Sequence, residues 1–314
     1  LDSLYLFAFI AFLVAFSGSI QDIAIDAFRI ELAELSQQGN LAASYQFGYR
    51  MAILVSSSFA LIFASDYGWS LTYQLMAFLM LIGVVGILIC PEGINSSLKK
   101  LTLQNSIFLP LKDFISRFGL YFASFLLMII ATYRLTDIVM GPMASPFYLE
   151  KGYTLKEIGY VVKVVAVIAS ILGFFLGGIL VKRLGVKMTL IIGALLVLVT
   201  NLSFSAIALL DKDLSLLGLV VGADSLAAGV VGTANITFLT SLVSKQYTAV
   251  QYALLTSFMM LPGKIFSGFS GLIANYFKSS QGTEYGWMLF FIFTSFLTIP
   301  SIILLLYYSK REHS

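Results

Sequence analysis

The sequence predicts an all-α, polytopic membrane protein, and two observations carry this prediction: the composition and the length of the apolar segments. Of the 314 residues, 59% are hydrophobic and only 11% are charged, whereas a soluble domain holds about 45–50% apolar and about 25% charged residues. Apolar segments long enough to cross a bilayer, which takes about 20 residues, recur nine times. They lie at roughly 4–30, 42–65, 71–90, 114–145, 158–181, 187–209, 214–242, 249–276 and 287–308, so we expect nine transmembrane helices.

The composition also excludes several classes of function. The net charge of +3 is too small for a nucleic-acid-binding protein, and the basic residues lie in short turns instead of one patch. The single cysteine, Cys90, and the single histidine, His313, allow neither a disulfide framework nor a Cys/His metal site. No histidine lies in an apolar segment to act as a base, so we expect neither a cofactor nor an intramembrane acyl- or glycosyltransferase.

Lysine and arginine residues predict the orientation of the chain, because cytoplasmic loops carry an excess of both. With the C-terminal Lys310 and Arg311 in the cytoplasm, further basic residues fall on that side: Lys99, Lys100, Lys112, Arg117, Lys182, Arg183, Lys187 and Lys245. The opposite side keeps Lys151, Lys156, Lys212 and Lys278, mostly beside acidic residues. The first apolar segment lacks the basic region that precedes a cleavable signal peptide. An odd number of helices places Leu1 outside, so we expect the chain to be the remainder of a longer one.

The first apolar segment ends in charged residues that a membrane helix rarely holds. At about 100° per residue, Asp22, Asp26 and Arg29 fall within about 60° on one helix face. Ionisable groups at membrane depth are costly and normally face a bundle interior or a watery cavity, which favours a substrate or proton pathway. The alternative is a structural Asp–Arg cluster that pins neighbouring helices.

Several later segments carry polar residues of the same kind. Arg50 lies in the second segment, where we expect its positive charge to pair with the carboxylates of the first. In the fourth, Arg134 and Asp137 have the i, i+3 spacing of a local ion pair. Asp224 lies deep in the seventh segment, which favours a functional or paired role, whereas Lys264 in the eighth suits a cavity or a membrane interface. Hydroxyl and amide groups that could bind a polar cargo accompany these charges: Gln21, Tyr45, Gln46, Tyr49, Tyr133 and Asn235.

Two sets of residues resemble known families. Residues 178–187 are similar to the loop motif of the major facilitator superfamily, Gly-x-x-x-Asp-Arg-x-Gly-Arg-Arg, through Gly178, Arg183, Gly185 and Lys187, with Lys182 where the motif has aspartate. A longer set resembles the AmpG-like anhydromuropeptide permeases, in the order of that family: residues 21–29, 48–56, 146–149, 152–159, 248–257 and 261–264. Acetyl-CoA transporters resemble parts of the same pattern.

This resemblance implies a twelve-helix carrier of two six-helix bundles in the bacterial inner membrane. Such carriers import GlcNAc–anhydroMurNAc, with or without a peptide stem, using the proton gradient. They serve peptidoglycan recycling, which the family links to β-lactamase induction. The nine helices would correspond to helices 4–12, the first three being absent. Residues 1–94 would then form a partial N-terminal bundle, 95–111 a cytoplasmic linker and 112–314 a C-terminal six-helix bundle.

Within that framework we expect Asp22, Asp26 and Asp137 to couple transport to protons, because the proton affinity of an aspartate changes with burial and nearby cations. The expected substrate pathway consists of Gln21, Arg29, Tyr45, Tyr49, Arg50, Tyr133, Arg134, Asp224, Asn235 and Lys264. The partners would be a polar substrate, protons and the lipid bilayer, with the chain acting as a monomer. Two alternatives stay open: a transporter of another polar cargo, such as an acetyl-CoA-like molecule, a peptide or a nucleoside, and a truncated, non-transporting remnant.

Overall fold

The computed structural model describes residues 2–32, 34, 37–90 and 103–310, and nearly all of them are helical. The first elements are α1 (Asp2–Leu32), α2 (Gln38–Ile53), the π-helical η2 (Leu54–Phe59), α3 (Ala60–Tyr67) and α4 (Trp69–Ile89). The next are α5 (Leu103–Phe118), α6 (Leu120–Tyr133), α7 (Leu135–Glu150), α8 (Leu155–Tyr160) and the π-helical η3 (Val161–Val165). The last are α9 (Ala166–Leu209), α10 (Leu214–Leu242), α11 (Thr248–Ser267), α12 (Ser270–Gln281), α13 (Thr283–Phe296) and α14 (Ile299–Lys310). No strand occurs in these ranges, which confirms the all-α prediction.

The helices coincide with the apolar segments of the sequence. Among the described residues, six helical stretches are long and apolar enough to cross a membrane. They are Tyr5–Leu32, Trp69–Ile89, Leu120–Glu150, Ala166–Leu209, Leu214–Leu242 and Thr283–Lys310. The chain is therefore a multi-pass membrane protein. The expected segments 42–65 and 249–276 are helical as well, as α2–η2–α3 and α11–α12.

The 44-residue helix α9 holds two of the expected membrane segments. It bends at Gly185, where φ is 80° and ψ is 166°, a conformation that glycine adopts without steric cost. The hydroxyl of Thr189 donates a hydrogen bond of 2.8 Å to the carbonyl of Gly185. This bend separates the segments that the sequence predicts at 158–181 and 187–209.

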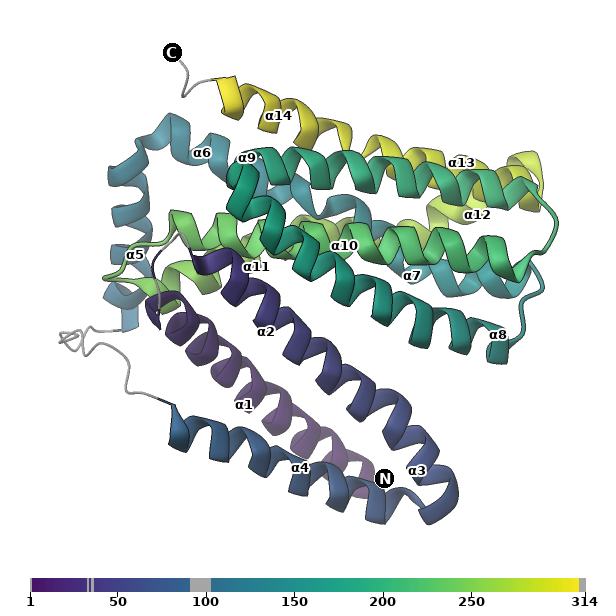
Figure 1. The fold of residues 1–314 in the computed structure, drawn as a ribbon, viewed down its shortest axis with the longest axis horizontal. Coiled ribbons are helices and arrows are strands. Elements are labelled where there is room, and N and C mark those ends of the chain that lie inside the picture. Colours follow the sequence, from purple (N-terminus) through teal and green to yellow (C-terminus); the bar gives the residue numbers. More distant parts are fainter. Residues whose placement is uncertain (1, 33, 35–36, 91–102, 311–314) are drawn as a thin grey trace.

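Figure 1 shows two groups of helices. The larger group contains α6–α14, most of them running in similar directions, and α5 crosses its left end. The smaller group, α1–α4, meets the larger one where α2 packs on α9 and α10 and where α1 packs on α11. From there, α2 and α3 diverge from α9 (Figure 1). The division into residues 1–94, 95–111 and 112–314 stays a prediction.

Two apolar clusters form the interior of the larger group. One joins α6, α9, α10, α11 and α14 through residues such as Leu126, Leu190, Phe238 and Leu255. The other joins α7, α9, α10 and α13 near the opposite end, with Phe147 and Phe291 at its centre. Their rings lie 4.9 Å apart in a T-shaped arrangement, which aromatic pairs favour. Polar side chains of the membrane helices are therefore presented by a packed scaffold.

Close approach of α9 and α10 depends on two glycines. A Cβ atom on Gly173 would collide with the carbonyl of Leu226, and one on Gly229 would collide with the carbonyl of Ser170 and approach the Cα atom of Gly173 to 2.8 Å. Small residues allow membrane helices to pack backbone against backbone in this way. The contact fixes the helix pair that carries Thr200 and Asp224.

We expect Gly229→Ala to destabilise the protein by about 1–3 kcal/mol, because an added methyl group forces a packed backbone apart. Thermal unfolding in detergent would measure the effect as a lower midpoint. Gly218→Ala is the matched control, since Gly218 lies in the same helix with no atom within 4 Å of its Cβ position. The control should be neutral or slightly stabilising, because alanine favours helix over glycine. Equal midpoints for the two variants would contradict this account of the packing.

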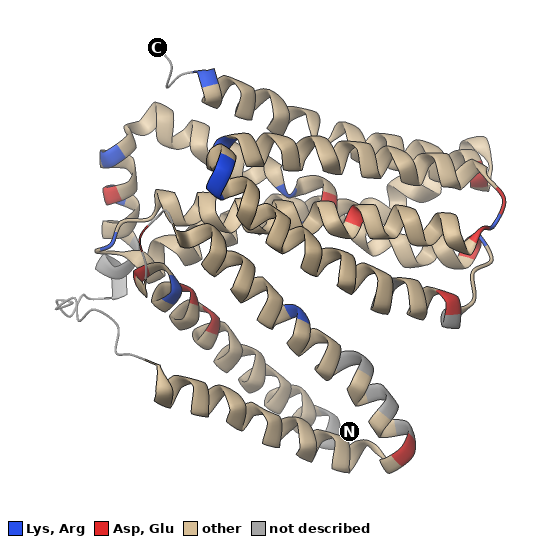
Figure 2. Cartoon of the chain, in the orientation of Figure 1, with Lys and Arg blue, Asp and Glu red and all other residues tan. Residues whose placement is uncertain are grey.

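Charged residues are distributed unequally between the two ends of the larger group (Figure 2). One end, called the basic end, carries Arg117, Lys182, Arg183, Lys245 and Lys310, all exposed. The blue segments at the left of Figure 2 mark this end on α5, at the bend of α9 and at the end of α14.

At the opposite end, lysines are paired with carboxylates. Lys151 lies 3.0 Å from Glu284, Lys212 lies 2.9 Å from Glu157 and Lys278 lies 2.8 Å from Glu150. The hydrogen bond from Lys212, helped by those from Thr154, lowers the pKa of the Glu157 carboxyl to about 2. At the basic end, Arg117 pairs with Asp113 at 2.9 Å, but positive charges outnumber such pairs. This excess supports the predicted orientation, although a cytoplasmic C-terminus stays a prediction.

Candidate functional site

A group of polar side chains surrounds Arg29 where the two groups of helices meet. Arg29 comes from the last turn of α1 and is only 5% exposed. Its guanidinium donates hydrogen bonds to Gln38 Oε1 at 3.2 Å and to Thr240 Oγ1 at 3.3 Å. It also lies 5.8 Å from the ring centre of Tyr45 and 5.4 Å from that of Tyr252. We call Asp26, Arg29, Gln38, Tyr45, Thr240 and Tyr252 the Arg29 cluster.

The aspartates of α1 have different surroundings. Asp26 Oδ1 lies 3.6 Å from Arg29 Nε, as their spacing on one helix face predicts. Asp22 and Gln21, about one turn earlier, are exposed. Arg29 connects α1 to α10 and α11 through Thr240 and Tyr252, whereas Asp22 is exposed. A role of these aspartates in a substrate or proton pathway stays a prediction.

Arg50 of α2 is half-buried, and its surroundings differ from the sequence expectation. Within the described residues it makes no ion pair, and so it does not pair with the carboxylates of α1. Its guanidinium instead lies 5.7 Å from the ring centre of Phe174 on α9. Nearby on α2, Gln46 packs against Gly232 of α10, whereas Tyr49 is 56% exposed.

Arg134 interrupts the helix that the sequence predicts at 114–145. Its backbone angles, φ −103° and ψ 4°, end α6 and begin α7. Arg134 Nε lies 3.4 Å from Asp137 Oδ2, and both side chains are about a quarter exposed, at 25% and 22%. This confirms the expected local ion pair. Tyr133 is buried beside them and donates to the carbonyl of Leu190 at 3.2 Å, so it holds α6 against α9.

The remaining candidates of the C-terminal helices fall in three different environments. Asp224 of α10 accepts a hydrogen bond of 2.9 Å from Thr200, and the charge of Asp137 acts on it. Asn235 is 2% exposed and donates to the sulfur of Met259, which places it inside the larger group. Lys264 is exposed on α11, next to Gly263, which packs on Ile138. Asp224 is therefore bound by Thr200 between α9 and α10, while Asn235 and Lys264 have other surroundings.

Comparison with known proteins identifies the family. The model of the major facilitator superfamily matches residues 1–267. The chain belongs to this superfamily. Putative transporter AmpG 1 of Rickettsia bellii is 30% identical over 311 residues, which cover 97% of this chain and 74% of the relative. Putative transporter AmpG 4 of Rickettsia felis is 31% identical over 318 residues, covering 99% and 73%. The anhydromuropeptide permease of Escherichia coli K12 is 31% identical over 301 residues, covering 95% and 59%. These relatives confirm the AmpG-like resemblance.

The loop motif of this AmpG-like chain lies at the boundary between the two groups of helices. The Cβ position of Gly178 lies 3.5 Å from the side chain of Ala43 and from the carbonyl of Gly39. Arg183 is exposed, Gly185 forms the bend of α9, and Lys187 Nζ lies 4.2 Å from the ring centre of Tyr308. The motif therefore joins the two groups on its glycine side and presents charge at the basic end.

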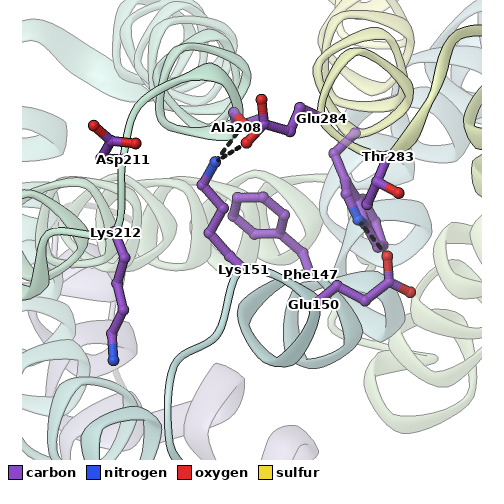
Figure 3. Close-up of a pocket in the computed structure, with 9 residues that line it drawn as sticks. Phe147, Glu150, Lys151, Ala208, Asp211, Lys212, Thr283 and Glu284 are labelled. Atoms are coloured by element: carbon purple, nitrogen blue, oxygen red, sulfur yellow. Dashed lines mark hydrogen bonds and ion pairs between the residues drawn. The ribbon is translucent and has the colours of Figure 1, made fainter.

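A cavity of about 220 Å³ is lined by none of the loop-motif residues or the candidate residues described above. Its lining residues come from α7, α9, α13 and the turn after α9, at the end opposite the basic end, and Figure 3 shows them as sticks. Trp287 donates to Glu150 at 2.9 Å, and Lys151 donates to the carbonyl of Ala208 and to Glu284. Its lining is Phe147, Glu150, Lys151, Ala208, Asp211, Lys212, Thr283, Glu284 and Trp287. These bonds join the helix ends, and the sequence analysis did not foresee the cavity.

Sequence reasoning also missed Gln38, Thr240 and Tyr252, the partners of Arg29. Gln38 and Thr240 are 1% and 6% exposed. One signal could have indicated Thr240: Thr233, Thr237 and Thr240 follow the i, i+4, i+7 spacing of one helix face. Within the described part of the chain, no group of three or more His, Cys, Asp or Glu side chains could hold a metal ion.

Proposed function

We propose that this chain is a proton-coupled importer of anhydromuropeptides in the bacterial inner membrane. Its AmpG-like relatives include a protein named as an anhydromuropeptide permease, and its helices carry charged side chains on both sides of the boundary between the groups. The proposed cargo is GlcNAc–anhydroMurNAc, with or without a peptide stem. Import of this kind would serve peptidoglycan recycling, with the C-terminus in the cytoplasm.

The observation that carries the proposal is the environment of Arg50. A charged side chain at membrane depth is costly and normally pairs or marks a substrate pathway. Arg50 makes no ion pair within the described residues, and it lies where α2 packs on α9 of the other group of helices. Its guanidinium would receive a carboxylate of the cargo, since arginine binds carboxylates in a bidentate geometry. Tyr49, next to Arg50 in the chain and 56% exposed, offers an aromatic face to a sugar ring.

Proton coupling is proposed for acidic residues that lie near arginines. Asp26 pairs with Arg29 on α1, and Asp137 pairs with Arg134 at the break between α6 and α7. Movement of either arginine during alternating access would change the charge next to the carboxylate, and with it the proton affinity. Asp26 is the first candidate because the other partners of Arg29 include Thr240 and Tyr252 in the larger group of helices. Asp22, which is exposed, and Asp137 are the further candidates.

Uptake into proteoliposomes would test the proposed cargo. Radiolabelled GlcNAc–anhydroMurNAc should accumulate when an inward proton gradient is imposed, and a protonophore should abolish the accumulation. Unlabelled cargo should compete, whereas acetyl-CoA, a dipeptide and a nucleoside should not. Competition by one of those three alone would assign another polar cargo to the same carrier. Absence of any uptake would contradict the transport proposal.

A further inference from the structure

The two groups of helices are closed together at the basic end and separate toward the other. At the start of α2, Gln38, Ala42 and Ala43 are at most 3% exposed. A Cβ atom on Gly39 would approach Val181 of α9 to 3.0 Å. Further along α2, Tyr49 and Met51 are 56% and 40% exposed. The burial of α2 therefore decreases away from the basic end, in agreement with its divergence from α9 in Figure 1.

Arg29 joins the two groups at this closed end. Its hydrogen bond to Thr240, 211 residues away in the chain, crosses from α1 to α10, and the Tyr252 ring on α11 faces the same guanidinium. Gln38 holds the guanidinium from its own group, because it accepts from Arg29 and donates to the carbonyl of Ile30 at 3.1 Å. The hydroxyl of Thr240 donates a hydrogen bond of 2.8 Å to the carbonyl of Ile236. Its oxygen is therefore oriented to accept the hydrogen bond from Arg29.

The turn between α10 and α11, which separates Thr240 from Tyr252, is fixed by a buried glutamine. Gln251 is 2% exposed and accepts from the backbone N–H of Ser244 at 2.7 Å. It also donates to the carbonyl of Pro110 and to Asp113 on α5, both at 2.8 Å. Arg117 of α5 binds the carbonyl of Leu242 in the same turn. The partners of Arg29 in the larger group therefore lie on a rigid support.

We propose that Arg29 is a latch that keeps the basic end closed, with Gln38, Thr240 and Tyr252 as its positioning residues. Opening of this end would break the contacts to Thr240 and Tyr252, because they belong to the other group. The contacts to Gln38 and Asp26 would persist, because these residues move with α1 and α2. Asp26, now 3.6 Å from Arg29 Nε and without a hydrogen bond to it, then becomes the main partner of the freed guanidinium. The inference rests on the proposed transport role, to which it adds the residues that connect the gate to Asp26.

Cysteine labelling without any cargo would test the latch. Cys90 is the only cysteine, so a Cys90→Ser, Ala43→Cys chain reports on the closed surface, where Ala43 is 3% exposed and faces Gly178. Thr240→Val in this background should raise the rate of maleimide labelling roughly tenfold, because a hydrogen bond to a charged group is lost from the closed state only. Thr240→Ser should restore the original rate.

Thr237→Val is the matched control. Thr237 lies on the same helix, is fully buried and also donates to a backbone carbonyl, that of Thr233 at 2.9 Å. It makes no side-chain hydrogen bond to α1 in the described structure, so its labelling rate should stay within about twofold of the parent chain. Faster labelling in both variants would indicate general loosening, and an unchanged rate in Thr240→Val would show that the bond does not hold the gate. Either result would overturn the latch.

Uptake kinetics separate the latch from the proposed cargo. Labelling follows the open fraction, whereas the apparent affinity follows the closed fraction. If Thr240→Val lowers the population closed at the basic end, KM for uptake should therefore rise far less than the labelling rate, and the maximal rate should change less than about twofold. A variant that is merely damaged would lose maximal rate. Labelling that responds as expected while no anhydromuropeptide is transported would leave the latch intact and refute the cargo. Uptake with no labelling response would refute the latch alone.

Discussion

Replacing Arg50 by glutamine is expected to lower anhydromuropeptide uptake by about 100-fold at a limiting cargo concentration. Hydrogen bonds to a charged group contribute about 1.5–3 kcal/mol each, which corresponds to roughly 10- to 150-fold in binding. Arg50 has no carboxylate partner in the described structure, so its replacement removes no internal ion pair and should leave the thermal unfolding midpoint nearly unchanged. Radiolabelled uptake and thermal unfolding of the same preparations would measure the two effects.

A modified cargo makes the test specific. Peptide-free GlcNAc–anhydroMurNAc whose lactyl carboxylate is converted to an amide should be taken up poorly by the unaltered protein. It should lose little more in Arg50→Gln, because the two changes remove the same interaction. Arg50→Lys keeps the charge but loses the bidentate geometry, so it should fall between the two. Additive losses from the amide and from Arg50→Gln would show that Arg50 binds something other than this carboxylate.

The helices of this chain could be predicted from the sequence because the bilayer fixes their length and apolar character. All nine apolar segments lie in helices, and the i, i+3 pairs Asp26–Arg29 and Arg134–Asp137 are present at 3.6 Å and 3.4 Å. Such pairs depend only on the geometry of one helix. The break at Arg134 is harder to predict, because the nearest helix-breaking sequence, Gly141-Pro142, lies inside α7.

Contacts between distant helices could not be predicted in the same way. The expectation that Arg50 pairs with the carboxylates of α1 was wrong, because the face of α2 that carries Arg50 packs on Phe174 of α9. Thr240 is a common residue for a membrane helix, and nothing in the local pattern indicates that it meets Arg29, 211 positions away. Periodicity gives the polar face of a helix, but the helix that packs against this face depends on the whole fold.

Replacing Asp26 by asparagine is expected to abolish accumulation of the cargo while leaving exchange across the membrane intact. With one proton carried per molecule, an imposed gradient of two pH units supports up to roughly 100-fold accumulation, since each unit is about 1.4 kcal/mol. An asparagine cannot bind that proton, so the internal and external concentrations should become about equal. Counterflow of labelled cargo against unlabelled cargo needs no proton and should stay within about threefold of the unaltered rate.

Two matched variants test whether this coupling belongs to Asp26. Asp22→Asn makes the same chemical change about one helical turn earlier, at an exposed residue with no ion pair in the described structure, and Asp137→Asn makes it in the pair with Arg134. Asp26 differs from both because its partner Arg29 also binds Thr240 across the closed basic end. Opening of that end would release Arg29 from Thr240 and leave its guanidinium to Gln38 and Asp26, so the interaction of Arg29 with Asp26 would change. Asp22 has no such partner in the described structure. If Asp22→Asn or Asp137→Asn loses accumulation while Asp26→Asn keeps it in full, Asp26 does not carry the coupled proton. Proton coupling would then not depend on the latch.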